Sequence, residues 1–178
     1  GGRQFLCQIE LELENGKKEE ILSGFYYDWF ITKSPIIKQS IYEGEIYDAR
    51  LENKIDGFFG KSTDIDYFTN KWMFSVNVEE PKGNLYPSNI EPIQVIKEMP
   101  YKEVNKIDNN VFVYDFKQIF AGWVSIKVQG ESGSKVTLRY GEGLNENGRV
   151  DQTNLRSADC EDVYILKGEG VESYTPRF

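Results

Sequence analysis

The chain has 178 residues, of which 39% are hydrophobic and 14% aromatic, enough to bury a core and too many for a globally disordered chain. Its 29 acidic and 21 basic residues leave a net charge of −8, which repels a phosphate backbone, so no nucleic-acid partner is expected. The absence of histidine excludes Ser-His and Cys-His nucleophiles and histidine-bound metals within these residues.

Residues 5–13 alternate apolar and polar side chains with the period of two that a β-strand requires. Asn15-Gly16 follows, a pair that tolerates positive φ at both positions of a tight turn, and residues 20–22 begin a second strand. The opening therefore predicts a β-hairpin.

Three further alternating runs follow in the second half of the chain. Residues 111–116 come after the cluster 108–110, whose Asp and Asn side chains fold back on the backbone. Residues 124–129 and 136–140 flank the turn-rich stretch 130–134. This arrangement predicts a hairpin in which the two flanking runs pair with each other.

Residues 163–166, closed by the turn-forming residues 168–170, predict one more strand. No window carries apolar residues at helical spacing with caps at both ends, although a short helical turn is expected near residues 64–70. Short strands with regular turns indicate an all-β fold, an antiparallel β-sandwich with little helix.

Prolines and other turn formers concentrate between residues 80 and 92, where they could hardly sit inside a β-ladder. We therefore expect two small β units, residues 1–80 and 93–178, joined by a linker over residues 81–92.

The chain shows neither a membrane signature nor a disulfide framework. Its apolar stretches are far shorter than a bilayer requires and no charged-then-apolar leader opens it, so we expect a soluble protein without a membrane partner; its compartment is unknown. Cys7 and Cys160 are too sparse for a disulfide framework or a zinc site and are expected to be small buried thiols.

A series of short motifs resembles one protein family. Gly44-Glu45-Ile46-Tyr47-Asp48-Ala49-Arg50 is similar to a string that recurs in the amino-terminal region of bacterial α-L-rhamnosidases. Five further motifs follow in that family's order: Asp115-Phe116-Lys117-Gln118, Ala121-Gly122-Trp123-Val124, Leu138-Arg139-Tyr140-Gly141-Glu142, Asn154-Leu155-Arg156 and Tyr164-Ile165-Leu166-Lys167-Gly168. The chain is therefore identified as a member of this family.

The resemblance implies a modular bacterial enzyme that cleaves terminal α-L-rhamnose from glycans and glycosides. Such enzymes join several β-sandwich modules, which the resemblance implies to be of jelly-roll or concanavalin-like type, to a helical (α/α)-barrel that carries the catalytic acids. No counterpart of the barrel stands in this sequence, and the match begins partway through the first sandwich module and ends within the second. We therefore expect a non-catalytic segment of the parent enzyme, inactive by itself, with no catalytic residue.

Two positions depart from the family pattern. Lys117 stands where the family usually has glycine, and Ile119 stands where it often has asparagine. These departures argue against a ligand role for that turn and leave the expected fold unchanged.

The most suggestive polar cluster is Glu45 with Asp48 and Arg50. Alternation along an extended strand would place Asp48 and Arg50 on one face, where an arginine–carboxylate fork could pin two modules together or hold a sugar hydroxyl. We favour the structural role over sugar contact, and sugar contact over catalysis.

Two single residues and one charge run complete the candidates. Trp123 begins an alternating run with polar partners, so its ring could face outward near a module boundary and stack on a sugar. Arg156 could face either a neighbouring module or solvent. The acids Asp159, Glu161 and Asp162 are interpreted as an exposed charge run.

No cofactor is expected. Asp64, Asp66 and Asn70 could supply oxygen ligands to calcium, but the glycine and the terminal glutamate of a helix-loop-helix calcium loop are missing, so a solvated loop is the preferred interpretation.

Three functions remain open for a non-catalytic rhamnosidase segment: bracing the catalytic barrel, aiding substrate recognition, or acting as a stand-alone carbohydrate-binding module for rhamnose-containing glycans. The expected partners are the rest of the parent enzyme, including its helical barrel, and rhamnose-containing carbohydrate. Edge-to-edge self-association is a further expectation, because a strand without its neighbour exposes unpaired N–H and C=O groups.

Overall fold

The computed structural model describes residues 4–24, 29–54, 73–79, 82–84 and 86–177. The chain divides into two compact units, one formed by residues 1–33 and 54–90, the other by residues 34–53 and 91–178. The second unit therefore takes a short segment of the first half of the chain into its own fold.

The predicted hairpin at the start of the first unit is confirmed. Strands β1 (Gln8–Glu12) and β2 (Lys18–Leu22) pair antiparallel, with Glu12 opposite Lys18. The turn differs from the expected tight one, because only Gly16 has a positive φ, +79°, while the side chain of Asn15 accepts a hydrogen bond from the Lys17 amide at 3.0 Å. A three-residue loop with glycine in the left-handed position results.

A second strand pair in the same unit joins distant parts of the chain. Strands β3 (Phe30–Ile31) and β6 (Met73–Phe74) pair antiparallel, and the rings of Phe30 and Phe74 lie 4.8 Å apart. Trp29 packs edge-on against Phe5 and donates its indole N–H to the carbonyl of Leu22 at 3.2 Å.

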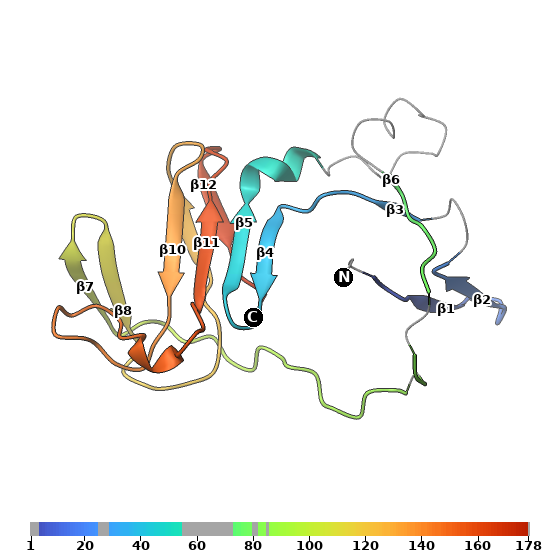
Figure 1. Ribbon diagram of the computed structural model, residues 1–178, viewed down its shortest axis with the longest axis horizontal. Coiled ribbons are helices and arrows are strands. Elements are labelled where there is room, and N and C mark those ends of the chain that lie inside the picture. The colour runs from blue at the N-terminus through green and yellow to red at the C-terminus, as the bar shows by residue number, and fades with distance from the viewer. Residues whose placement is uncertain (1–3, 25–28, 55–72, 80–81, 85, 178) are drawn as a thin grey trace. The chain divides into compact units, whose positions relative to one another are not determined.

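The second unit is built on a four-stranded sheet in the order β10–β11–β5–β4, whose strands run side by side in Figure 1. Its bounds are β4 Ile36–Ser40, β5 Gly44–Asp48, β10 Lys135–Arg139 and β11 Glu161–Ile165. Strands β4 and β5 form a hairpin, and β10 and β11 are antiparallel, but β5 and β11 are parallel. The expected antiparallel sandwich thus contains one parallel pair.

A two-stranded sheet, β9 (Ile126–Gln129) with β12 (Val171–Tyr174), supplies the other side of the core. Tyr164, Leu166 and Tyr174 are each at most 5% exposed and form a core cluster with Ala49. Burying a side chain such as Leu166 stabilises the fold by about 2 kcal/mol. The partly buried side chains of Tyr47, Ile126, Val128, Val136 and Leu138 pack around this cluster.

The strands predicted at residues 124–129 and 136–140 form, but the prediction that they pair with each other is wrong. β9 pairs with β12, and β10 pairs with β11. The intervening turn carries the chain from one sheet to the other, because the apolar faces of both runs fill the same core from opposite sides. The chain also passes from one sheet to the other between β11 and β12. The turn there packs closely on the turn between β9 and β10, because a Cβ on Gly168 would lie 2.7 Å from the Ser132 nitrogen.

A third part of this unit is the hairpin β7 (Glu103–Asp108) and β8 (Val111–Asp115). The segment after β8 places Lys117 at φ +57°, a left-handed conformation that glycine adopts most readily. Lys117 instead gains ion pairs with Glu103 at 2.7 Å and Asp115 at 2.8 Å. A glycine at position 117 would adopt this conformation without strain.

The all-β sandwich expectation is confirmed. Helical structure among the described residues is limited to two short 3₁₀ segments, η1 (Ala49–Lys54) and η2 (Thr153–Leu155). No helix among them is long and apolar enough to span a membrane. Cys7 and Cys160 are free thiols, half-buried where burial was expected. The expected helical turn at residues 64–70 and the calcium-ligand candidates Asp64, Asp66 and Asn70 lie outside the described residues.

Candidate functional site

The central polar feature of the second unit is the segment from Gly44 to Arg50, which runs along β5 and into η1. Gly44 has φ +87°, and a Cβ there would collide with the carbonyl group of Glu161. Only glycine lets β5 approach β11 this closely, so the first residue of the motif has a purely structural explanation.

Glu45 is buried, with 2% of its surface exposed. Its Oε1 accepts a hydrogen bond from the hydroxyl of Tyr174 at 3.0 Å, and its Oε2 accepts one from the Gln39 amide at 3.1 Å. The guanidinium of Arg177 forms an ion pair with it, with Nε 3.9 Å from Oε2. A buried carboxylate needs such partners, since an unpaired buried charge is strongly destabilising.

A second buried carboxylate belongs to Asp162 on β11, which is 2% exposed. It accepts a hydrogen bond from the backbone amide of Glu45 at 2.8 Å and one from the Tyr140 hydroxyl at 2.7 Å. Asp162 therefore ties β11 to β5 through its side chain. The interpretation of Asp162 as part of an exposed charge run was wrong, because its position alternates in phase with Tyr164 and Leu166 on the core face.

Asp48 and Arg50 form the fork that the sequence suggested. Arg50 donates Nε to Oδ1 of Asp48 at 2.9 Å and Nη2 to Oδ2 at 2.8 Å. The expected extended strand is not the cause: Asp48 ends β5, and Arg50 lies in η1 and also donates its backbone amide to Oδ1 at 3.1 Å. The fork therefore braces the strand-to-helix corner.

The guanidinium of Arg50 also lies against the turn between β9 and β10. A Cβ added to Gly133 would stand 3.2 Å from Nη1 of Arg50. The side chain of Arg50 is 48% exposed and that of Asp48 only 7%. The fork thus connects the end of β5 with a turn between the two sheets.

Tyrosine rings fill the space beneath this segment. Tyr164 stacks on Tyr174 with ring centroids 4.7 Å apart, and Tyr47 lies 5.8 and 5.7 Å from them. Burial raises the pKa of Tyr47 to about 12, and its hydrogen bond to Glu52 adds to this. Burial likewise raises the pKa of Tyr174, with the Glu45 carboxylate contributing. These hydroxyls remain protonated donors at neutral pH.

A third buried carboxylate, Glu172 on β12, is held by backbone and tyrosine donors. The amides of Lys167 and Gly168 donate to it at 3.0 and 2.9 Å, and the hydroxyl of Tyr164 donates at 2.9 Å. Burial alone would raise the pKa of Glu172, but these donors together hold it below its usual value. The carboxylate therefore stays charged and caps the turn between β11 and β12.

The other two candidates stand apart from this network. Trp123 is half-buried in the irregular segment before β9 and lies outside the strand that it was expected to begin. Arg156 is exposed at the end of η2 with φ +56°, and no ion pair joins it to another described residue. The structure brings Glu45, Asp48 and Arg50 into one segment and leaves Trp123 and Arg156 separate.

The network also contains residues that the sequence analysis did not select as site candidates. They are Gln39, Tyr140, Asp162, Glu172 and Tyr174. For Asp162 and Glu172 the available signal was the period of two, which places them in line with core residues of their strands. Tyr140 shows the same period, in phase with Val136 and Leu138, whereas Gln39 gave no such signal.

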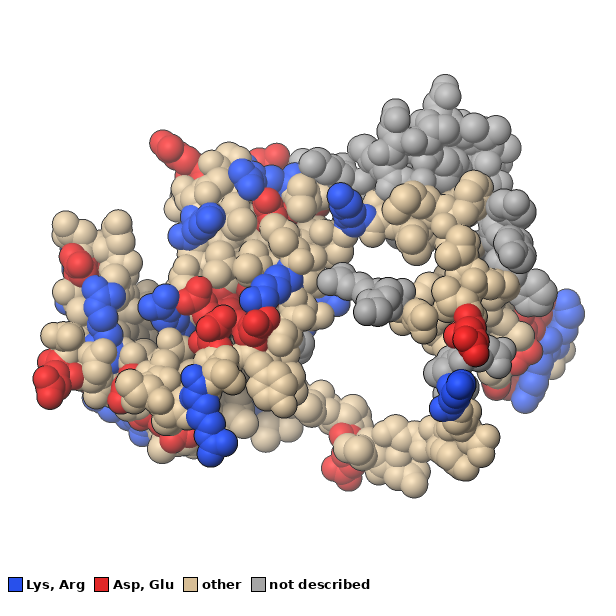
Figure 2. Space-filling model, viewed as in Figure 1, with Lys and Arg blue, Asp and Glu red and all other residues tan. Residues whose placement is uncertain are grey.

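The chemistry of the segment follows from these contacts. The carboxylates of Glu45 and Asp162 accept hydrogen bonds from groups of the same unit and are sealed from solvent. No group of three or more cysteine, aspartate and glutamate side chains that could hold a metal occurs within the described ranges. In the view of Figure 2, acidic side chains gather on the surface of the second unit with basic side chains beside them. The arrangement is suited to locking strands together.

Two family models match the chain. Residues 1–97 match the alpha-L-rhamnosidase N-terminal domain, and residues 105–178 match the bacterial alpha-L-rhamnosidase concanavalin-like domain. Among curated proteins, the chain is similar to an alpha-L-rhamnosidase of Streptomyces avermitilis, at 35% identity over 97% of this chain and 16% of the relative. An alpha-L-rhamnosidase of Formosa agariphila is 27% identical over 96% of this chain and 18% of the relative.

Solved structures agree with these matches. The alpha-L-rhamnosidase from Dictyoglumus thermophilum has a TM-score of 0.82 at 37% identity, over 97% of this chain and 19% of that chain. The Streptomyces avermitilis alpha-L-rhamnosidase complexed with L-rhamnose has a TM-score of 0.82 at 35% identity, over 97% of this chain and 16% of that chain. The chain thus spans 16% to 18% of the length of the two curated relatives described above.

The two model matches meet inside a single folded unit. β4 and β5 fall within the first match, and β10 and β11 fall within the second, yet the four strands form one sheet. The buried contacts of Glu45 with Asp162 and Tyr174 cross this division. The segment from Gly44 to Arg50 is therefore part of the structural joint between the two matched regions.

Proposed function

The chain belongs to the bacterial α-L-rhamnosidase family, and from this membership we propose that it forms a non-catalytic β-sandwich portion of an enzyme that hydrolyses terminal α-L-rhamnose from glycans or glycosides. In this proposal the portion supports the part of the enzyme that carries the catalytic acids. The chain by itself does not hydrolyse rhamnosides.

The observation that carries this proposal is the burial of the two carboxylates of the motif. Glu45 is 2% exposed and Asp48 is 5% exposed, and both carboxylates bond to groups of their own unit. An inverting or retaining glycosidase needs two carboxyl groups that flank a sugar and a water or a nucleophilic centre open to it. Side chains committed to internal hydrogen bonds favour the structural role.

Two measurements on matched proteins test the proposal. The purified chain is expected to release no product from an aryl α-L-rhamnoside. Deleting these residues from the rhamnosidase polypeptide that contains them is expected to lower its melting temperature, while turnover of the small aryl substrate by the folded fraction persists. Release of rhamnose by the chain alone, abolished by Glu45→Gln, would refute the supporting role.

A stand-alone carbohydrate-binding role is the second candidate, and a relative of similar fold whose structure holds L-rhamnose motivates it. Calorimetric titration of the chain with L-rhamnose, with and without calcium, separates the two. Saturable heat favours carbohydrate binding, and Trp123→Ala and Arg50→Ala then identify the side chains concerned. The absence of binding heat under both conditions favours the supporting role alone.

A further inference from the structure

One face of the β7–β8 hairpin carries a cluster of exposed apolar side chains. Val104 stands opposite Tyr114, and Lys106 stands opposite Phe112, so the four share one face of the two-stranded sheet. Tyr101 joins them, with its ring 5.2 Å from that of Tyr114 at an interplanar angle of 79°. We call these five residues the outer hairpin face.

The apolar members of the outer hairpin face are all about half exposed. Val104 is 44% exposed, Phe112 49%, and Tyr101 and Tyr114 54% each. Single exposed apolar residues are common on protein surfaces, but neighbouring ones on a single face mark an interaction surface. Tyrosine and phenylalanine are also the types enriched where proteins contact one another.

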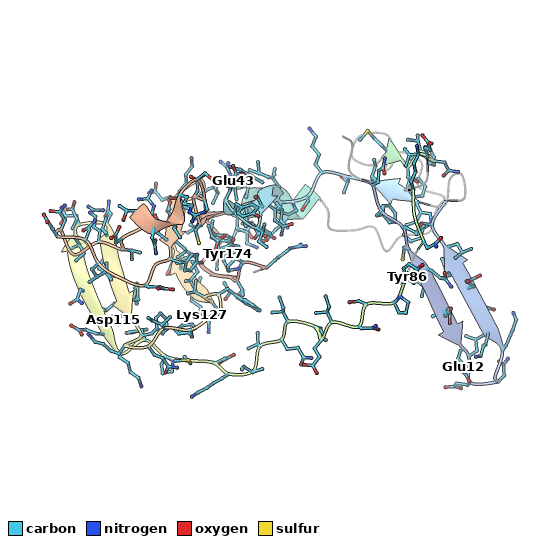
Figure 3. The ribbon with its side chains drawn as sticks, turned by 60° about the horizontal axis from the view of Figure 1, so that its bottom comes forward. Glu12, Glu43, Tyr86, Asp115, Lys127 and Tyr174 are labelled. Atoms are coloured by element: carbon cyan, nitrogen blue, oxygen red, sulfur yellow. The ribbon has the colours of Figure 1, made fainter. Side chains whose placement is uncertain are left out.

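The opposite face of the same hairpin is already packed. Val113 is 7% exposed, and the Cδ1 of Ile107 would lie 3.2 Å from a Cβ on Gly148. Lys117 clamps the open end of the hairpin to both strands through Glu103 and Asp115, the latter labelled in Figure 3. The outer hairpin face is therefore the exposed side of a hairpin whose other side already packs on its own unit.

The positive charge of Lys106 indicates which chemistry a partner of the outer hairpin face should have. Lys106 is exposed and stands opposite Phe112 in the strand register, and no ion pair joins it to a described residue. A partner surface that covers the aromatic rings would also surround this ammonium group, which then needs a carboxylate opposite it. The matching partner is apolar and carries an acidic group near its centre.

The length of the relatives indicates where such a partner is found. This chain covers 16% to 19% of the two solved rhamnosidases described above, so most of each relative's polypeptide lies outside the matched part. We infer that the outer hairpin face docks against an apolar surface bearing a carboxylate on the remaining part of the rhamnosidase polypeptide. This inference rests on the proposed supporting function and identifies the surface through which support is given.

Hydroxyl-radical footprinting tests the docking residue by residue. Oxidation rates of Tyr101, Phe112 and Tyr114 are compared between the isolated chain and the longer rhamnosidase polypeptide that contains it. Covering half-exposed rings at a packed interface is expected to slow their oxidation by about fivefold or more. Tyr42, which is 70% exposed in the turn between β4 and β5, serves as the reference and should react equally in both.

A charge-reversal variant adds a second readout. Lys106→Glu in the longer polypeptide is expected to restore the oxidation rates of Phe112 and Tyr114 toward those of the isolated chain. The matched control is Lys127→Glu, which reverses an exposed charge on β9 and should leave the protection unchanged. In the isolated chain neither substitution should change the rates.

Several outcomes would overturn the docking inference. Equal oxidation rates in both proteins would show an uncovered face. If protection of the isolated chain depends on its concentration, a second copy of the chain covers the face. If the isolated chain is protected at all concentrations, other residues of the same chain cover it. If added L-rhamnose protects the rings, the face binds the sugar. If the face is unprotected while deletion of these residues still destabilises the enzyme, the supporting function stands and this surface does not provide it.

Discussion

Substituting Gly44 by alanine tests whether the close approach of β5 to β11 holds the second unit together. The new Cβ would meet the carbonyl oxygen and carbon of Glu161, which are backbone atoms and cannot swing away as a flexible side chain would. The alanine must also adopt φ +87°. Either the residue strains or the two strands separate.

The magnitude of this effect follows from two contributions. The left-handed conformation costs a residue with a Cβ about 1 to 2 kcal/mol. Forcing an extra methyl group into a packed site costs a further ~1 to 3 kcal/mol. We therefore expect Gly44→Ala to lower the free energy of unfolding by about 3 kcal/mol, a large part of what a domain of this size possesses.

Gly170 provides the matched control. It has φ +79°, close to that of Gly44, but nothing lies within 4 Å of a Cβ built there. Gly170→Ala therefore carries the conformational cost without the collision. The difference between the two variants isolates the contact of β5 with the Glu161 backbone.

Two experiments on the wild type and both variants measure the difference. Urea unfolding gives the free energy of unfolding, and hydrogen exchange reports the protection of the β11 amides. Gly44→Ala is expected to unfold at clearly lower urea and to lose protection at residues 161–165 first. If Gly44→Ala costs no more than Gly170→Ala, the strands adjust without penalty and the close approach does not matter for stability.

Three further predictions concern the network around β5. Tyr174→Phe removes a donor from the buried carboxylate of Glu45 and should cost about 1.5 to 3 kcal/mol in urea unfolding, whereas Tyr42→Phe, an exposed control, should cost nothing measurable. The pKa of Tyr47 is about 12 in the fold, against 10.0 for a free tyrosine, so the fold favours its neutral form. Its contribution to the free energy of unfolding is therefore complete below pH 10 and is lost as the pH rises toward 12. The urea midpoint should fall across that interval, less steeply in Tyr47→Phe, and a flat midpoint would contradict the assignment. Arg50→Lys keeps the charge but loses the two-pronged hydrogen bond, so its melting temperature should drop below that of wild type; an unchanged value would mean that charge alone suffices.

The alternation of apolar and polar residues predicted where the strands lie but not which strands pair with each other. The runs that became β9 and β10 each have one apolar face, and a hairpin or a crossing between sheets satisfies that pattern equally. The choice depends on where the apolar faces meet, which is a property of the whole core. Ile126 and Val136 pack around the same buried tyrosines from opposite sheets, so pairing across the turn was excluded.

The candidate site shows the same division. The motif around Glu45, Asp48 and Arg50 stood out because its residue string resembles a family, and the structure places it at the joint of two matched regions. The sequence motif did not reveal that Glu45 and Asp48 are buried, since an acidic residue on a strand is usually exposed. One of the donors to the Glu45 carboxylate is Tyr174, 129 positions later in the chain.

The sequence by itself determined the all-β class, the first hairpin, the lack of histidine chemistry and the family, because these depend on residue type and short-range spacing. Tertiary structure alone decided that β5 joins the sheet of the second unit in parallel with β11, that Asp162 and Glu172 are buried, and that the outer hairpin face stays uncovered by the described residues of its own unit. These features depend on which distant segments exclude water from each other, and hydrophobic burial and the pairing of buried polar groups are settled only when the whole core closes.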